Sequence, residues 1–235
     1  YYDKVSKDKA QVWAQLHIRN DKKSKFEGSV EFDLQSSEGK SIAKEVCKLK
    51  LSKNSDGKVK TVFHLNKPKL WSPQTPNLHH LIIDMRDKSG HSVDGYMQKI
   101  GSRSIEFKGE DGFWLNGEPY PEAVIGGNRH QDFAVVGNAL ANSMHWRDAK
   151  KLRDAGMTVI RNAHYPQDPA FMDACDALGL LVIENIPGWQ YWDNNPLFEE
   201  RVYSDIRNMI RRDRNRPSVW MWEPILNETN YPDYF

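Results

Sequence analysis

TVIRNAHYPQDPAFMDACDALGLLVIEN, residues 158–185, indicates the fold of the second half of this chain. Residues 158–163 predict a buried strand, and Asp168-Pro169 predicts a helix N-cap followed by proline at the first helical position. Apolar side chains then recur at helical spacing up to Gly179, at Phe171, Met172, Cys175 and Leu178. Residues 180–184 predict a second buried strand. This order is typical of two parallel strands joined by a right-handed crossover.

The same alternation of strand and helix signals extends in both directions from this segment. Further elements are expected at about 122–127 (strand), at about 143–155 (helix), from Asn195-Pro196 onward (helix) and at 218–222 (strand). Asn142 or Ser143 is the expected N-cap of the first helix, and Gly156 is its expected end. The alternation predicts a parallel sheet covered by helices in residues 105–235.

The first hundred residues follow a different pattern. Apolar and polar residues alternate in short runs, for example in residues 12–18 and 59–65. A period of two places one face of a strand on a core and the other face in water. About seven short strands separated by turn residues predict an immunoglobulin-like β-sandwich over residues 1–104. Soon after it, Asn116-Gly117 predicts a tight hairpin turn.

The composition of the 235 residues is that of a globular protein, with 39% apolar and 28% charged residues. The net charge of +1 creates no overall field that would attract nucleic acid or an anionic membrane. No apolar run approaches the roughly 20 residues of a membrane-spanning helix. Neither a G-x-G-x-x-G motif nor a phosphate loop is present to bind a nucleotide. We therefore expect no nucleic-acid partner, no membrane span and no cofactor.

Polar side chains follow each of the four predicted strands. The segments are Asn128-Arg129-His130-Gln131-Asp132, Arg161-Asn162-Ala163-His164-Tyr165, Glu184-Asn185 with an aromatic loop after it, and Glu223-Pro224-Ile225-Leu226-Asn227-Glu228. In a parallel barrel the active site lies at the carboxyl ends of the strands. A single polar residue at a strand end is often only a structural hydrogen-bonding group. Four such segments at one face predict a binding or catalytic site.

Several segments, taken in order, resemble glycoside hydrolase family 2. The resemblance is carried by residues 70–78 (LWSPQTPNL), 126–132 (GGNRHQD), 160–166 (IRNAHYP) and 212–218 (RDRNRPS), and by the pair Asn227-Glu228. It covers nearly the whole chain and implies a β-sandwich followed by the first half of a (β/α)8 TIM barrel. The form Asn-Arg-His-Gln-Asp favours the β-galactosidases of the family over its β-glucuronidases and β-mannosidases.

The resemblance also implies roles for individual residues in a retaining exo-β-glycosidase that hydrolyses terminal β-galactosides. Glu228 is expected to be the general acid/base, and Asn227 is expected to bind the sugar 2-hydroxyl. His130 and His164 are expected to bind sugar hydroxyls or to stabilise the transition state. Arg161 is expected to orient the nucleophilic carboxylate.

The loop after the third predicted strand bears on sugar stacking and on metal binding. Trp189 is expected to form a platform for a sugar ring, and simple packing within the loop is an equal alternative. Some β-galactosidases of the family carry a metal-binding Glu-x-His at about this place. Here Gly188 and Gln190 occupy those positions, so no magnesium is expected.

Two other carboxylates leave alternatives open. The segment from Trp222 to Glu228 has one residue more than the family usually has, which a β-bulge could absorb, so Glu223 is a rival for the acid/base role. Glu184 closes the third strand and is expected to be a structural or hydroxyl-binding residue. The nucleophile is expected on a later strand, beyond Phe235, and the chain alone is therefore expected to be inactive.

Other functions remain open from the sequence alone. They are a β-glucuronidase or β-mannosidase of the same family, and a non-catalytic carbohydrate-binding or interaction protein on a degenerate barrel. The expected partner is an oligosaccharide or β-galactoside substrate. A half-barrel exposes two strand edges and an apolar inner face, so either a homo-oligomer or a weakly stable chain is expected.

Overall fold

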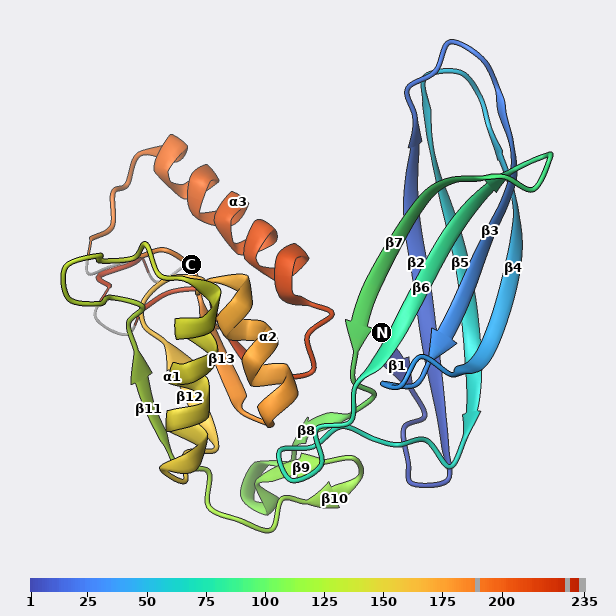
Figure 1. The fold of residues 1–235 in the computed structure, drawn as a ribbon. Helices are drawn as coiled ribbons and strands as arrows, with labels where there is room; N and C mark the ends of the chain where they lie inside the picture. Colours follow the sequence, from blue (N-terminus) through green and yellow to red (C-terminus); the bar gives the residue numbers. More distant parts are fainter. Residues whose placement is uncertain (189–190, 227–228, 233–235) are drawn as a thin grey trace. The chain divides into compact units, whose positions relative to one another are not determined.

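A computed structural model describes residues 1–188, 191–226 and 229–232 of the chain. The chain forms two compact units, one made of Tyr1–Trp71 and Asn77–Tyr120 and the other of Ser72–Pro76 and Pro121–Phe235. Figure 1 shows that long strands dominate the first unit, whereas strands and helices alternate in the second.

The first unit contains a β-sandwich of two antiparallel sheets. One sheet has the strand order β1-β2-β5 and the other has the order β4-β3-β6-β7. The strands are β1 (Tyr2–Asp3), β2 (Lys9–Asn20), β3 (Phe26–Gln35), β4 (Ser41–Leu51), β5 (Ser55–Asn66), β6 (His79–Asp87) and β7 (Ser92–Ile100). The sandwich that the alternating pattern predicts is confirmed.

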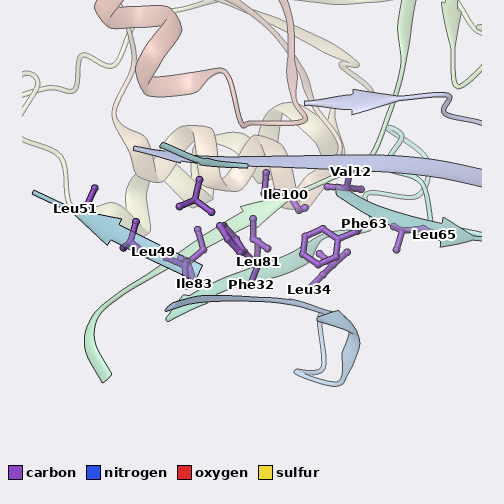
Figure 2. Packing of buried hydrophobic residues seen from close by; sticks show 13 residues of the cluster. Val12, Phe32, Leu34, Leu49, Leu51, Phe63, Leu65, Leu81, Ile83 and Ile100 are labelled. Atoms are coloured by element: carbon purple, nitrogen blue, oxygen red, sulfur yellow. The ribbon is translucent and has the colours of Figure 1, made fainter. Parts of the chain in front are cut away.

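The core of the sandwich consists of alternate apolar side chains of both sheets. Figure 2 shows them meeting in one layer between the strands. Phe32 on β3 and Phe63 on β5 are 0% and 1% exposed. Complete burial of a side chain of this kind contributes about 1.5–3 kcal/mol. The hydrophobic effect therefore decides which face of each strand turns inward.

A small antiparallel sheet completes the first unit. Its strand order is β10-β9-β8, with β8 (Ile105–Phe107), a short 3-10 helix (Gly109–Asp111), β9 (Phe113–Leu115) and β10 (Glu118–Pro119) along the chain. Asn116 and Gly117 join β9 to β10 with φ angles of 58° and 82°. Two consecutive left-handed residues are what a tight hairpin turn requires, so the turn predicted at this pair is confirmed.

The second unit is built on a parallel sheet with the strand order β11-β12-β13-β14. Its elements along the chain are β11 (Gly126–Arg129), α1 (Asn142–Asp154), β12 (Val159–Asn162), α2 (Pro169–Leu178), β13 (Leu181–Asn185), α3 (Pro196–Asp213) and β14 (Val219–Glu223). Parallel strands in chain order, with a helix between each strand and the next, are the arrangement of a (β/α)8 barrel, of which this sheet provides four strands.

Helices cover one face of this sheet. Figure 1 shows α1 and α2 side by side against the strands. Ile160 of β12 and Val182 of β13 are fully buried against Phe171 and Cys175 of α2. Because successive strand residues alternate between faces, Arg161 and its register partner Ile183 lie on the opposite face. We call this opposite face the inner face of the partial barrel.

The position predicted for the first strand is wrong by several residues. The strand covers Gly126–Arg129 rather than residues 122–127. A Cβ on Gly126 would lie 1.8 Å from the carbonyl oxygen of Val159, so only glycine allows β11 to approach β12 here. Glycine is disfavoured in strands by propensity, and for that reason sequence reasoning placed the strand too early.

The helix caps were predicted in part. Asp168 accepts a hydrogen bond from the backbone N–H of Ala170 at 2.8 Å, and Gly179 ends α2 in the left-handed conformation, so both predictions for this helix are confirmed. The N-cap predicted for α1 is wrong. It is Ala141, which has no side-chain acceptor, rather than either of the two polar residues that follow it.

Candidate active site

The carboxyl ends of the four parallel strands bring the predicted site segments to one edge of the sheet. His130 directly follows β11, and His164 lies just beyond the end of β12. Arg161 lies within β12, and Glu223 is the last residue of β14. Since all four strands run in the same direction, these side chains share the edge where barrel enzymes bind their substrates.

Two of the predicted sugar-binding residues contact each other. The rings of His130 and His164 meet edge to face, with their centroids 5.5 Å apart and their planes at 82°. The Tyr165 ring lies 6.4 Å from His130, and its hydroxyl accepts a hydrogen bond from the backbone N–H of Gln131 at 3.2 Å. Imidazoles offer both N–H donors and nitrogen acceptors. The two histidines, which follow different strands, can therefore both bind hydroxyl groups of a ligand.

Arg161 and Glu223 form a two-pronged ion pair. The Nε of Arg161 donates to Oε2 of Glu223 at 2.7 Å, and its Nη2 donates to Oε1. Strand β13 lies between the two strands that carry these residues, so the pair bridges three strands. The side chains are 20% and 19% exposed, so water screens the pair only partly. A bidentate guanidinium–carboxylate contact fixes orientation as well as distance.

Glu184 and Asn185, at the end of β13, point to opposite faces of the sheet. Arg212 at the end of α3 donates to Glu184 at 2.9 Å, so Glu184 faces the helices. Asn185 is the next residue and the register partner of Glu223. It therefore lies on the inner face, beside the Arg161–Glu223 pair.

Asn185 is a polar group of the inner face to which sequence reasoning assigned no role. Its side chain is fully buried, and within the described parts of the chain neither amide atom has a hydrogen-bond partner. Buried polar groups in folded proteins are almost always paired, and an unpaired one costs about 1–3 kcal/mol. The signal in the sequence was its position directly after Glu184 at a strand end.

Glu184 belongs to a buried network on the helix side. Its carboxylate accepts hydrogen bonds from Nδ2 of Asn162 and from Arg212, which also binds Asp213 at 2.6 Å. Burial raises the pKa of Glu184, and the nearby carboxylate of Asp213 raises this pKa further. The network ties β12, β13 and α3 together. This placement agrees with a structural role for Glu184.

Arg129 is a buried residue beside the candidate site to which sequence reasoning assigned no role. Its guanidinium donates to Gln167 and, at 2.9 Å, to Asp148, and it lies 4.0 Å from the centre of the Phe171 ring. The residue is 6% exposed. These contacts fix the end of β11 against α1 and α2, and His130 is the next residue. Its position directly before His130 was the signal available in the sequence.

Three predicted site residues, Asn227, Glu228 and Trp189, lie outside the described residues, and their roles stay predictions.

Among residues 1–188, 191–226 and 229–232, no group of three or more His, Cys, Asp or Glu side chains is placed to hold a metal ion. In the same part of the chain, no helix has the length and apolar character needed to cross a membrane.

Comparison with known proteins addresses the family directly. Residues 1–103 match "Glycosyl hydrolases family 2", and residues 105–235 match "Glycosyl hydrolases family 2, TIM barrel domain". A β-galactosidase of Thermoanaerobacter pseudethanolicus is 37% identical over 167 residues, which are 70% of this chain and 22% of that protein. A β-glucuronidase of Bacteroides fragilis is 31% identical over 233 residues, which are 95% of this chain and 32% of that protein.

A solved structure shows the same fold. The crystal structure of a Bacteroides uniformis β-glucuronidase matches with a TM-score of 0.91 and 30% identity, over 97% of this chain and 27% of that one. The chain thus spans between 22% and 32% of the length of these relatives. The predicted fold class, an immunoglobulin-like sandwich followed by part of a TIM barrel, is confirmed. The chain belongs to glycoside hydrolase family 2.

Proposed function

We propose that this chain is part of a retaining exo-β-glycosidase and that terminal β-galactosides are its first candidate substrates. The observation that carries the proposal is the contact between His130 and His164 at the carboxyl ends of parallel strands, with Arg161 on one of the same strands. Membership of the family supports hydrolysis of glycosidic bonds. The β-galactoside is favoured by the motif that contains His130.

The proposed chemistry needs two carboxyl groups with different tasks. One protonates the departing glycosidic oxygen and later deprotonates a water molecule, and the other forms a covalent glycosyl–enzyme intermediate. We assign the first task to Glu228. Asn227 binds the sugar 2-hydroxyl, a contact that strengthens at the transition state. The nucleophile is expected on a later strand of the barrel.

The described residues supply binding and orientation. His130 and His164 bind sugar hydroxyls, since their rings lie together at the substrate edge. Arg161 presents a fixed positive charge from β12 and orients the nucleophilic carboxylate. Trp189 stacks against an apolar sugar face.

A β-glucuronide is the second candidate substrate. The relative that covers 95% of this chain and the structure that covers 97% of it are both β-glucuronidases, whereas the β-galactosidase match covers 70%. A β-mannosidase and a non-catalytic carbohydrate-binding protein remain as alternatives from the sequence.

The test is a screen of the full-length protein against the nitrophenyl β-galactoside, β-glucuronide and β-mannoside. The proposal expects release of nitrophenol from the galactoside or the glucuronide. NMR of the first-formed sugar should show the β-anomer, because a retaining mechanism inverts the anomeric carbon twice. An α-anomer would exclude retention, and no cleavage at all would favour the non-catalytic alternative.

A further inference from the structure

Glu223 lies on the inner face, and the sequence left open whether it or Glu228 is the acid/base. We propose that Glu223 is a positioning residue, which holds the guanidinium of Arg161 at the substrate edge, and that it is not the acid/base. This inference rests on the proposed glycosidase function.

The contacts of Glu223 are those of a bound carboxylate. Both of its oxygens accept N–H bonds from Arg161. A general acid must hold a proton and present it to the leaving oxygen. With both oxygens accepting N–H bonds from one guanidinium, the Glu223 carboxylate is directed at Arg161 and not at a leaving group. The geometry therefore favours orientation of Arg161 over proton transfer.

A β-bulge in β14 aims Glu223 at Arg161. Val182 of β13 pairs with Val219, but the next residue of β13, Ile183, pairs with Met221, so Trp220 is the additional residue. One additional residue moves every later side chain to the other face. Glu223 consequently lies on the inner face.

The buried side chains around the bulge agree with this shift. Val219, before the bulge, and Trp222, after it, both pack in the helix-side core. Without the bulge their separation of three residues would place them on opposite faces. Glu223, next to Trp222, must then point to the face that carries Arg161.

Holding Arg161 in place matters because arginine is long and has many rotamers. Fixing such a side chain in advance removes an entropy cost from the reaction. Glu223 engages one edge of the guanidinium, Nε and Nη2, which sets the direction of the whole planar group. A displacement of roughly 1 Å in a group that orients reactants can cost about 100-fold in rate.

The experiment uses four variants of the full-length protein: Glu223→Gln, Arg161→Gln, the double variant and Glu228→Gln. kcat and KM are measured on aryl glycosides with good and poor leaving groups. For Glu223→Gln we expect kcat to fall by about 100-fold, by the same factor for both leaving groups. The double variant should be no slower than Arg161→Gln alone, because Glu223 acts only through Arg161.

Other outcomes overturn the proposal. A loss in Glu223→Gln that grows with the poorer leaving group would make Glu223 the acid/base, with Glu228→Gln as the reference for that pattern. Independent, multiplying losses in the double variant would show that Glu223 does not act through Arg161. An unchanged kcat would remove any role in turnover.

Two controls separate this inference from its premises. Asp154→Asn removes an exposed pair with Lys150 and should leave kcat unchanged. A wild-type protein that cleaves no glycoside would overturn the proposed function instead. In that case a double-mutant cycle on unfolding still tests the pair, and the absence of coupling between Arg161 and Glu223 would overturn it.

Discussion

Asn162 on β12 donates a hydrogen bond to the carboxylate of Glu184 on the neighbouring strand β13, and both side chains are completely buried. The bond lies between the sheet and the helices, directly behind the residues of the inner face. Arg212 closes the same network from α3. The residues of the inner face therefore lie in front of a buried polar layer that joins β12, β13 and α3.

Replacing Glu184 by alanine should destabilise the chain. The change leaves the buried Asn162 amide without its acceptor, whereas Arg212 keeps its pair with Asp213, so the expected cost is about 1–3 kcal/mol. Glu200→Ala, on an exposed position of α3, is the matched control and should change stability by less than about 0.5 kcal/mol. Urea unfolding of both variants measures the difference. Equal stabilities would show that the network contributes nothing.

Truncation to alanine should lower the stability of the chain by different amounts at Asn162 and at Asn185, both of which are buried. Asn162→Ala removes a bonded amide from the Glu184 network and should cost about 1–3 kcal/mol. Asn185→Ala removes an amide that has no partner within the described residues, so its cost should be smaller by at least about 1 kcal/mol. Thermal unfolding of the two variants compares them directly. A larger loss for Asn185→Ala would reveal a bond to that amide.

Asp176 should make stability depend on pH. Burial raises its pKa to about 6 from the ordinary 3.8, despite hydrogen bonds from Ser218 and an ion pair with Arg216. Between these two pH values the folded chain holds a proton that the unfolded chain has lost. The stability contributed by this group therefore falls as pH rises from about 4 to about 6, by up to about 3 kcal/mol.

The measurement for Asp176 compares unfolding of the wild type with Asp176→Asn across this pH window. The substituted side chain does not titrate, so the difference between the two proteins isolates the carboxyl. The wild type should lose stability relative to the variant as pH rises. A constant difference, or one of opposite sign, would contradict the raised pKa.

Glu228→Gln in the full-length protein should slow hydrolysis of substrates with poor leaving groups far more than hydrolysis of activated aryl glycosides. A good leaving group needs little protonation, so it depends less on the acid. The measurement is kcat/KM over a series of leaving groups. Equal losses along the series would remove the acid/base assignment.

The 235-residue chain by itself should not hydrolyse glycosides. Retention needs two carboxyl groups about 5–5.5 Å apart, and the recognised motifs supply only one. The described sheet also has four of a barrel's eight strands, so β11 and β14 are edges. An assay beside the full-length protein, with light scattering for self-association, checks both points. Turnover within about tenfold of the full-length protein would show that the second carboxyl group is already present.

Local signals predicted most of the second unit. Asp168 and Gly179 bound α2 because capping depends on one residue and its immediate neighbours. His130 and His164 were expected at one edge because the carboxyl ends of parallel strands coincide. Their rings lie together there, while their roles in binding sugar stay predictions.

What the sequence could not reveal depends on register between strands. The β-bulge at Trp220 could not be read from the sequence, because it depends on how β14 pairs with β13. Only that pairing decides which face Glu223 occupies. The early start predicted for β11 has a similar cause, since the need for Gly126 arises from the closeness of β12.

The turn at Asn116-Gly117 has a consequence for the chemical ageing of the protein. Asparagine followed by glycine is the pair most prone to deamidation, in which the glycine nitrogen attacks the side-chain carbonyl. Here the side-chain oxygen of Asn116 accepts the backbone N–H of Ser104 at 3.1 Å, and its nitrogen donates to the carbonyl of Trp71 at 3.0 Å. Because both the oxygen and the nitrogen of the Asn116 side chain are hydrogen-bonded, the ring closure that begins deamidation requires the turn to open first. The rate of deamidation at Asn116 should therefore depend on how often the hairpin opens locally.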